Sequence, residues 1–229
     1  FERAFATLRD LDSSLTFVTM DGGAGTIPFS DLTGTPATRA VDEARDALTH
    51  ETVGKYLFTS GSTGMPKGVP QHQGMFVNLI AASEGLRDDP DPVDHPISLD
   101  WMPWNHISAG TIHFNANIAG GGTLYIDEGK PIPGMFETTI ANLREVSPMS
   151  FGSAPVAFAM LADAMERDST LRQAFFKNLR GMGYGGAMLS DDLYDRMQAL
   201  AIAETGERMP FTTMYGATET LGVTVVHWA

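Results

Sequence analysis

Short apolar runs alternate with helix-like segments through most of this chain, and this alternation limits the folds that it can adopt. Residues 56–59, 97–102, 123–126 and 211–214 each have the length and composition of a strand, and the first run is predicted to be buried. Strands that alternate with helices usually form a parallel sheet. We therefore predict an α/β fold, a largely parallel sheet flanked by helices, with ligands beyond the carboxyl ends of its strands.

Helix signals lie between these runs. Residues 74–86 and 108–118 have helical patterns. Pro155 suits the first turn of a helix, where its missing N–H is harmless. Ser190 is the predicted N-cap of another helix, which Gly206 ends.

Three segments lack this periodicity. Residues 19–40 are rich in Gly, Thr and Pro and are predicted to form a short hairpin or a loop region. Residues 86–96 and 127–134 combine prolines with charged side chains and are predicted loops. We also expect the chain, which begins at Phe1, to be a piece of a longer protein.

The composition excludes several classes of function. Lys and Arg number 15 against 28 Asp and Glu, a formal net charge of −13, so neither nucleic acid nor an anionic membrane surface is an expected partner. The chain has no Cys, which excludes disulfides, iron–sulfur clusters, thiolate zinc sites and cysteine nucleophiles. No apolar run reaches the length of a membrane span. We expect a cytoplasmic protein that acts on small molecules.

A glycine-rich loop follows the first strand and predicts a phosphate site. Its glycines let the backbone N–H groups approach an anion, its hydroxyls donate to phosphate oxygens, and its lysine supplies a mobile charge. The spacing is not that of a Walker loop, and a flexible surface loop is the alternative. The candidate phosphate ligands are Thr59, Ser60, Gly61, Ser62, Thr63, Gly64 and Lys67.

This loop resembles the signature of the adenylate-forming superfamily, which includes acyl-CoA synthetases, luciferases and peptide-synthetase adenylation domains. In that superfamily the loop closes over the β- and γ-phosphates of ATP. A second signature, Tyr-Gly-x-Thr-Glu, is matched from Tyr215 through Gly216 to Thr218 and Glu219. An aromatic face can stack on adenine, a hydroxyl can reach a phosphate, and a carboxylate can hold Mg²⁺. The resemblance gives these roles to Tyr215, Thr218 and Glu219.

Two further stretches lie in the superfamily's order. Residues 103–106 resemble its proline–aromatic–histidine segment, which places Trp104 and His106 at the acyl substrate, although Asn105 stands where an aromatic residue is frequent. Residues 183–187 resemble the strand end that floors the acyl pocket and contacts adenine. This implies that Gly185 and Gly186 contact the acid and that Gly186 and Ala187 contact ATP.

The closest resemblance, over about residues 53–219, is to feruloyl-CoA synthases. Residues 57–69, 99–106, 120–131 and 205–210 carry it. It implies an acid–CoA ligase of phenylpropanoid degradation that converts a hydroxycinnamate such as ferulate, with ATP, Mg²⁺ and CoA, first to an acyl-adenylate and then to a thioester.

The implied catalytic residues are Lys67, His106 and Glu219, with Glu219 as the metal ligand. Residues 1–229 would be the central ATP- and acid-binding portion of the large N-terminal domain. The ribose-binding Asp and the C-terminal subdomain with its catalytic Lys would lie outside this chain. Four alternatives stay open: a nucleotide-binding module without catalysis, an adenylating enzyme for another acid, a phosphotransferase, and a structural α/β domain whose glycines form turns.

Overall fold

A six-stranded sheet forms the centre of residues 49–229, and its strand order is β10-β9-β8-β7-β5-β6. Neighbouring strands are parallel, except that β9 and β10 are antiparallel. This confirms the predicted α/β fold with a largely parallel sheet. The strands are β5 (Ile97–Asp100), β6 (Thr123–Ile126), β7 (Ser150–Ser153), β8 (Gly181–Tyr184), β9 (Phe211–Ala217) and β10 (Leu221–Trp228).

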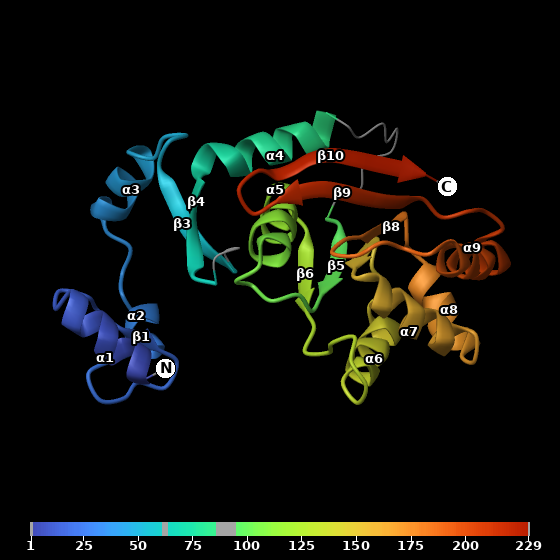
Figure 1. Ribbon diagram of the computed structural model, residues 1–229, viewed down its shortest axis with the longest axis horizontal. Helices are drawn as coiled ribbons and strands as arrows, with labels where there is room; N and C mark the ends of the chain where they lie inside the picture. The colour runs from blue at the N-terminus through green and yellow to red at the C-terminus, as the bar shows by residue number, and fades with distance from the viewer. Residues whose placement is uncertain (1, 61–63, 86–94, 229) are drawn as a thin grey trace. The chain divides into compact units, whose positions relative to one another are not determined.

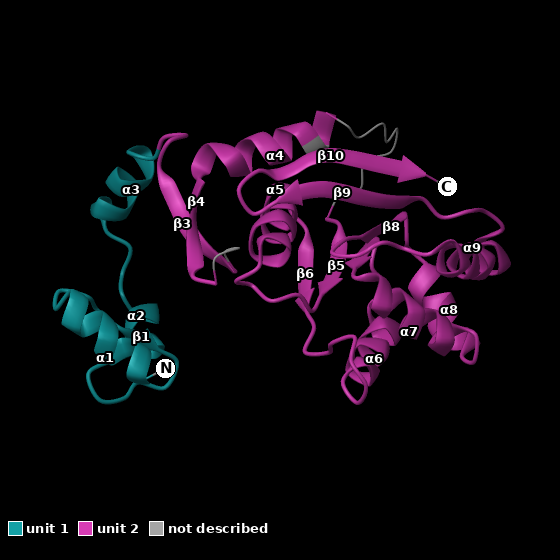
Figure 2. Cartoon of the chain, viewed as in Figure 1, with its two compact units in different colours: residues 1–48 teal, residues 49–229 magenta. Residues whose placement is uncertain are grey.

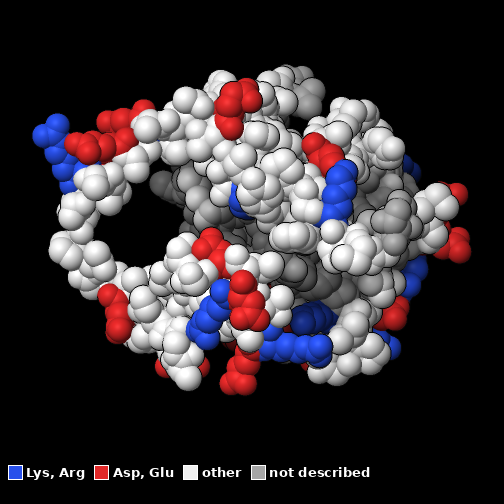
Figure 3. All heavy atoms as spheres, turned by 60° about the vertical axis from the view of Figure 1, so that its left-hand side comes forward, with Lys and Arg blue, Asp and Glu red and all other residues white. Residues whose placement is uncertain are grey.

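The structure is a computed structural model that describes residues 2–60, 64–85 and 95–228 (Figure 1). The chain divides into two compact units, Phe1–Leu48 and Thr49–Ala229 (Figure 2). No described helix is both long enough and apolar enough to cross a membrane. On the face shown in Figure 3, basic side chains are interspersed with acidic ones.

The first unit is small and open, and none of its described residues is buried. Of the two forms predicted for residues 19–40, the hairpin is wrong for β1 and β2, which pair in parallel with a helix directly after β2, and loops connect these short elements. Two-residue strands are too short to show a period in the sequence. The elements are α1 (Glu2–Leu11), β1 (Val18–Thr19), β2 (Ile27–Pro28), α2 (Phe29–Thr33) and α3 (Arg39–Asp46).

The helices of the second unit begin and end largely where the sequence places them. Pro155 is in the first turn of its helix, the Ser190 hydroxyl accepts from Leu193 N at 3.3 Å, and Gly206 ends the same helix with a φ of 81°. The helix predicted at 108–118 starts with a π-helical segment, η1. The helical elements are α4 (Gln73–Gly85), η1 (Ser108–His113), α5 (Phe114–Ala119), α6 (Phe136–Glu145), α7 (Pro155–Met165), α8 (Ser169–Phe176) and α9 (Asp191–Thr205).

The two faces of the central sheet differ in side-chain size, because successive residues of a strand point to opposite faces. Leu99, Phe151, Met182 and Phe211 lie on one face, in the same buried cluster as apolar side chains of α6–α9. The alternate positions face η1 and α5 and are mostly small or polar, with Leu124 as an apolar exception. They include Ser98, Asp100, Ser150, Gly152, Gly181, Gly183 and Thr212. One face therefore holds the core, and the other leaves room above the sheet.

Strands β3 (Val53–Ser60) and β4 (Pro66–His72) form a separate antiparallel hairpin. The prediction of a buried strand at 56–59 is wrong for most of that run. Leu57 is buried beside Val69, but Phe58 is 74% exposed. The reason is that the hairpin lies outside the central sheet and buries only one of its faces.

Candidate active site

The glycine-rich loop connects the two strands of the hairpin. Thr59 and Ser60 end β3, and each pairs across the hairpin with the start of β4, Thr59 with Lys67. Gly64 has a φ of 84°, in the left-handed region where glycine is favoured. Gly61, Ser62 and Thr63 lie outside the described residues. The ladder therefore holds the lysine beside the two hydroxyl residues of the motif.

Lys67 and Glu219 come together although 152 residues separate them. Lys67 Nζ lies 3.2 Å from Glu219 Oε1, and the two side chains are 63% and 43% exposed. A hydrogen bond from the backbone N–H of Glu219 lowers the pKa of its carboxyl group, and the contact with Lys67 lowers it further. The carboxylate is therefore ionised and accessible where the two predicted motifs meet.

The tight turn between β9 and β10 carries the second motif. Ala217 N donates to Thr220 Oγ1 at 3.1 Å, and Thr220 N donates to Ala217 O at the same distance. A Cβ on Gly216 would lie 1.8 Å from Leu221 O, so only glycine fits between these strands. Tyr215 precedes this glycine and is 77% exposed, which leaves its ring free to stack on a ligand.

Gln71 is a site residue that the sequence analysis missed. Its side chain is fully buried, and Nε2 donates to Thr218 O at 2.7 Å. Gln71 and Lys67 are four residues apart in β4 and so point to the same face of the strand. The two side chains thus contact consecutive residues of the β9–β10 turn and hold it against the hairpin. The signal in the sequence is a polar side chain two residues after Val69, on the side of the strand that is buried.

Lys55 ties the hairpin to η1 in a similar way. Its Nζ donates to Gly110 O and lies 5.4 Å from the centroid of the Phe76 ring. Burial lowers the pKa of Lys55. Because Gly110 N donates to His106 O at 3.0 Å, this lysine reaches the turn that carries the predicted acid-binding histidine.

His106 and Trp104 lie in the connection between β5 and η1. Ser108 N donates to His106 Nδ1 at 3.2 Å, so the neutral ring carries its proton on Nε2. The Trp104 ring packs 5.1 Å from that of Phe114 and stays half exposed. Close packing fixes this connection, because a Cβ on Gly110 would lie 1.9 Å from Trp104 O.

The segment from Gly185 to Ala187 leaves the carboxyl end of β8. Gly185 N donates to Ser153 O at 3.3 Å, and Gly186 has a φ of 79°. Both this segment and the His106 turn follow parallel strands of the same sheet, so both lie at its carboxyl edge. Among the described residues, no hydrogen bond joins either of them to Glu219, and the structure therefore pairs only two of the three predicted catalytic residues.

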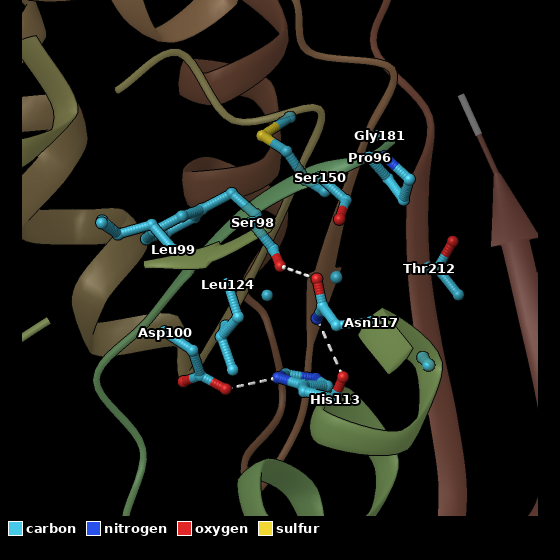
Figure 4. Close-up of a pocket in the computed structure, with 15 residues that line it drawn as sticks. Pro96, Ser98, Leu99, Asp100, His113, Asn117, Leu124, Ser150, Gly181 and Thr212 are labelled. Carbon is cyan, nitrogen blue, oxygen red and sulfur yellow. Dashed lines mark hydrogen bonds and ion pairs between the residues drawn. The ribbon is translucent and has the colours of Figure 1, made fainter. Parts of the chain in front are cut away.

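A cavity of about 320 Å³ lies on the small-residue face of the sheet, below η1 and α5 (Figure 4). At one end His113 Nδ1 lies 2.6 Å from Asp100 Oδ2. At the other side of His113, Ser98 Oγ donates to Asn117 Oδ1 at 2.7 Å, and Asn117 Nδ2 donates to His113 O at 2.9 Å. The sequence analysis did not name these four residues as site residues, because their contacts join a strand to a helix ten or more residues later.

The donor set fits a magnesium ion held mainly by substrate. The described residues contain no group of three or more acidic, His or Cys side chains arranged for a metal. Mg²⁺ commonly binds one or two carboxylates together with substrate phosphates. The ionised Glu219 offers such a carboxylate beside the phosphate-site lysine.

The sequence model of the AMP-binding enzyme family matches residues 14–229. The chain belongs to this family. Among solved structures, the luciferase-like enzyme of the nonluminescent mealworm Zophobas morio has a TM-score of 0.71 at 17% identity, and the match covers 98% of this chain and 48% of that one. A search of curated proteins gives no match.

Two further solved structures resemble a smaller part of the chain. A malonyl-CoA ligase with methylmalonyl-CoA and AMP bound has a TM-score of 0.62 at 20% identity, over 79% of this chain and 36% of that one. ATP-bound MatB from Rhodopseudomonas palustris has a TM-score of 0.57 at 17% identity, over 78% and 32%. The chain thus spans between a third and a half of these proteins, and at such identities the likeness concerns the fold.

Proposed function

We propose that residues 1–229 are the central ATP- and acid-binding portion of a longer enzyme. That enzyme would activate a carboxylic acid with ATP, release pyrophosphate, and pass the acyl group to CoA with release of AMP. The contact between Lys67 and Glu219 carries this proposal, because it brings two signature motifs of the matched family into one site. A protein free of Cys with this acidic charge suits the cytoplasm.

In this reaction the acid carboxylate attacks the α-phosphorus of ATP and pyrophosphate leaves. A carboxylate is already a nucleophile, so the site needs to position it and to neutralise charge. Lys67, with the hydroxyl and N–H groups of Thr59, Ser60 and Gly64, would neutralise the departing pyrophosphate. Glu219 would hold Mg²⁺, which when bound offsets the charge of the phosphate oxygens.

The remaining site residues would bind the two substrates. Tyr215 is exposed and offers its ring to adenine, with the backbone of Gly186 and Ala187 beside it at the carboxyl edge of the sheet. Thr218 would reach a phosphate. The Nε2–H of His106, which is left free by the bond to Nδ1, would donate to the acid carboxylate, with Trp104 near it.

The proposed acid is a hydroxycinnamate such as ferulate. The resemblance of residues 57–69, 99–106, 120–131 and 205–210 to feruloyl-CoA synthases supports this choice. The cavity of about 320 Å³, with a polar end at Asp100 and His113, also suits a compact acid that carries a polar group.

ATP–pyrophosphate exchange tests this function, with ferulate and Mg²⁺ and on both this chain and the full-length enzyme. Exchange that depends on ferulate is the expected result for the full-length enzyme. Exchange with malonate or a fatty acid instead would keep adenylation and correct the acid. Release of ADP would indicate a phosphotransferase. Binding of ATP without exchange would indicate a nucleotide-binding module. If ATP does not stabilise the protein, a structural domain is indicated.

We also predict that Gln71→Leu weakens ATP binding, because it removes the bond that holds Thr218 near Lys67. The loss of one hydrogen bond to a main-chain carbonyl should cost about 1 kcal/mol of stability. Calorimetric titration with ATP and denaturant unfolding measure the two effects. The matched control is Gln198→Leu, since Gln198 is also buried and donates to Met209 O at 2.8 Å, away from the motifs. Equal ATP affinities in the two variants would contradict the role of Gln71.

A further inference from the structure

We infer that the Asp100–His113 pair recognises a hydroxyl group on the ring of the aromatic acid. The inference rests on the proposed function, and it names the residues that determine which acid the enzyme selects. The cavity next to this pair has one wall without side chains and one polar end, an arrangement that suits a planar molecule with a polar tip.

The floor of the cavity is bare backbone. Gly152 and Gly183 are register partners on β7 and β8, and Gly181 lies two residues before Gly183 on the same face. A Cβ on Gly183 would meet only backbone atoms within 4 Å, the nearest at 3.8 Å, so there is open space directly above this residue. A flat ring can therefore lie against the peptide planes of β8.

The His113 ring is fixed over the edge of this floor. A Cβ on Gly152 would lie 3.4 Å from His113 Cε1 and 3.6 Å from Nε2, which is ordinary van der Waals contact, so the ring lies directly over this residue. A carboxylate only accepts hydrogen bonds, so Nδ1 donates to Asp100 Oδ2 across 2.6 Å. Asp100 is itself held, since its other oxygen accepts from Met102 N at 2.8 Å.

This arrangement gives His113 a defined chemical preference. With its proton on Nδ1, the neutral ring presents Nε2 as an acceptor that has no hydrogen-bond partner among the described residues. An acceptor requires a donor, so a phenolic hydroxyl satisfies it. A hydrogen atom or a methoxy group at the same ring position does not.

Two of the elements that line the cavity lead to the proposed carboxylate site at the carboxyl edge of the sheet. β8 leads from Gly183 directly to Gly185 and Gly186, and the helical run that begins at His106 reaches His113 seven residues later. From Gly183 to Gly186 the chain advances three residues, which span at most about 10 Å. That is about the length of a cinnamic acid from its carboxylate to a hydroxyl at the far end of its ring. The acid would thus lie along β8, with its carboxylate at His106 and its hydroxyl at His113.

The test compares kcat/KM of the full-length enzyme for 4-hydroxycinnamate, cinnamate and 4-methoxycinnamate. For the wild type we expect a tenfold to hundredfold preference for the hydroxylated acid over both others, since a site that bonds a hydroxyl rejects analogues that lack the donor. This comparison needs no variant. Equal kcat/KM for the three acids would overturn the inference and leave the adenylation function standing.

The variant His113→Phe should remove the preference by lowering kcat/KM for 4-hydroxycinnamate at least tenfold more than that for cinnamate. A purely structural role would lower both equally. Asp100→Asn, whose amide can donate to Nδ1 as well as accept from it and so no longer fixes the tautomer, should also reduce the preference. The matched control His50→Phe should retain it. Retention of the preference in His113→Phe would overturn the inference, whereas failure of the wild type with every acid would overturn the proposed function instead.

Discussion

Replacing Glu219 by Ala in the full-length enzyme is expected to abolish ATP–pyrophosphate exchange at ordinary Mg²⁺ concentrations. The variant removes the ionised carboxylate that would hold the metal, and it leaves Lys67 without its partner at 3.2 Å. Loss of a preorganised charge that acts on the transition state lowers the rate by a hundredfold or more. Exchange measured at saturating ATP and acid separates this loss from a change in substrate binding.

Two variants control this experiment. Glu219→Gln keeps the size of the side chain but removes its charge, so it should be nearly as inactive as the alanine variant. Glu207→Ala removes an exposed carboxylate that lies outside both motifs, and its exchange rate should equal that of the wild type. Normal exchange in Glu219→Ala would contradict the metal-binding role of this residue.

The lowered pKa of Glu219 sets the pH range in which this site is assembled. The contact with Lys67 needs the ionised form of Glu219, and the lowered pKa of this carboxyl group shows that the folded state favours that form. The contact therefore contributes fully at pH values above the usual pKa of a glutamate, and its contribution is lost as the pH falls through the lowered pKa. Both side chains are largely exposed, so the pair adds little to the stability of the fold. Its contribution is to the geometry of the site.

The sequence predicts those strands of the central sheet that are runs of apolar or β-branched residues. It does not predict strands that form only because of their neighbours in the tertiary structure. Strand β6 has the predicted bounds because four apolar or β-branched residues follow a glycine turn. Strands β7 and β8 contain mainly Ser and Gly, which have low strand propensity, and only their neighbours in the parallel sheet make them strands. Strand β10 lies outside the predicted strands, the last of which is residues 211–214.

The candidate site shows the same division. The family motifs predict Lys67 and Glu219, and the structure brings these two residues into contact. Gln71 and the Asp100–His113 pair belong to no motif that we used. Their partners lie on other elements of the fold, a turn for Gln71 and a helix or strand for the pair, so their role is visible only once these elements are packed together.

Phe151→Ala is expected to destabilise this chain by about 3–5 kcal/mol, the usual cost of removing a buried aromatic ring. Phe151 is 1% exposed, and its ring meets those of Phe158 and Phe175 edge to face, with centroids 5.6 and 5.5 Å away. Denaturant unfolding measures the change. The matched control is Phe58→Ala, which removes the same ring from the open face of β3 and should change the free energy of unfolding by less than about 0.5 kcal/mol.

Comparing these two variants shows whether the packed core or the β3–β4 hairpin contributes more to the free energy of unfolding. If it lies on the α6–α9 face of the sheet, only the Phe151 variant unfolds easily, and the small-residue face above Gly152 is free to serve the ligand. Similar losses in both variants would mean that the β3–β4 hairpin contributes as much as the core. The separation between a stabilising face and a binding face would then be wrong.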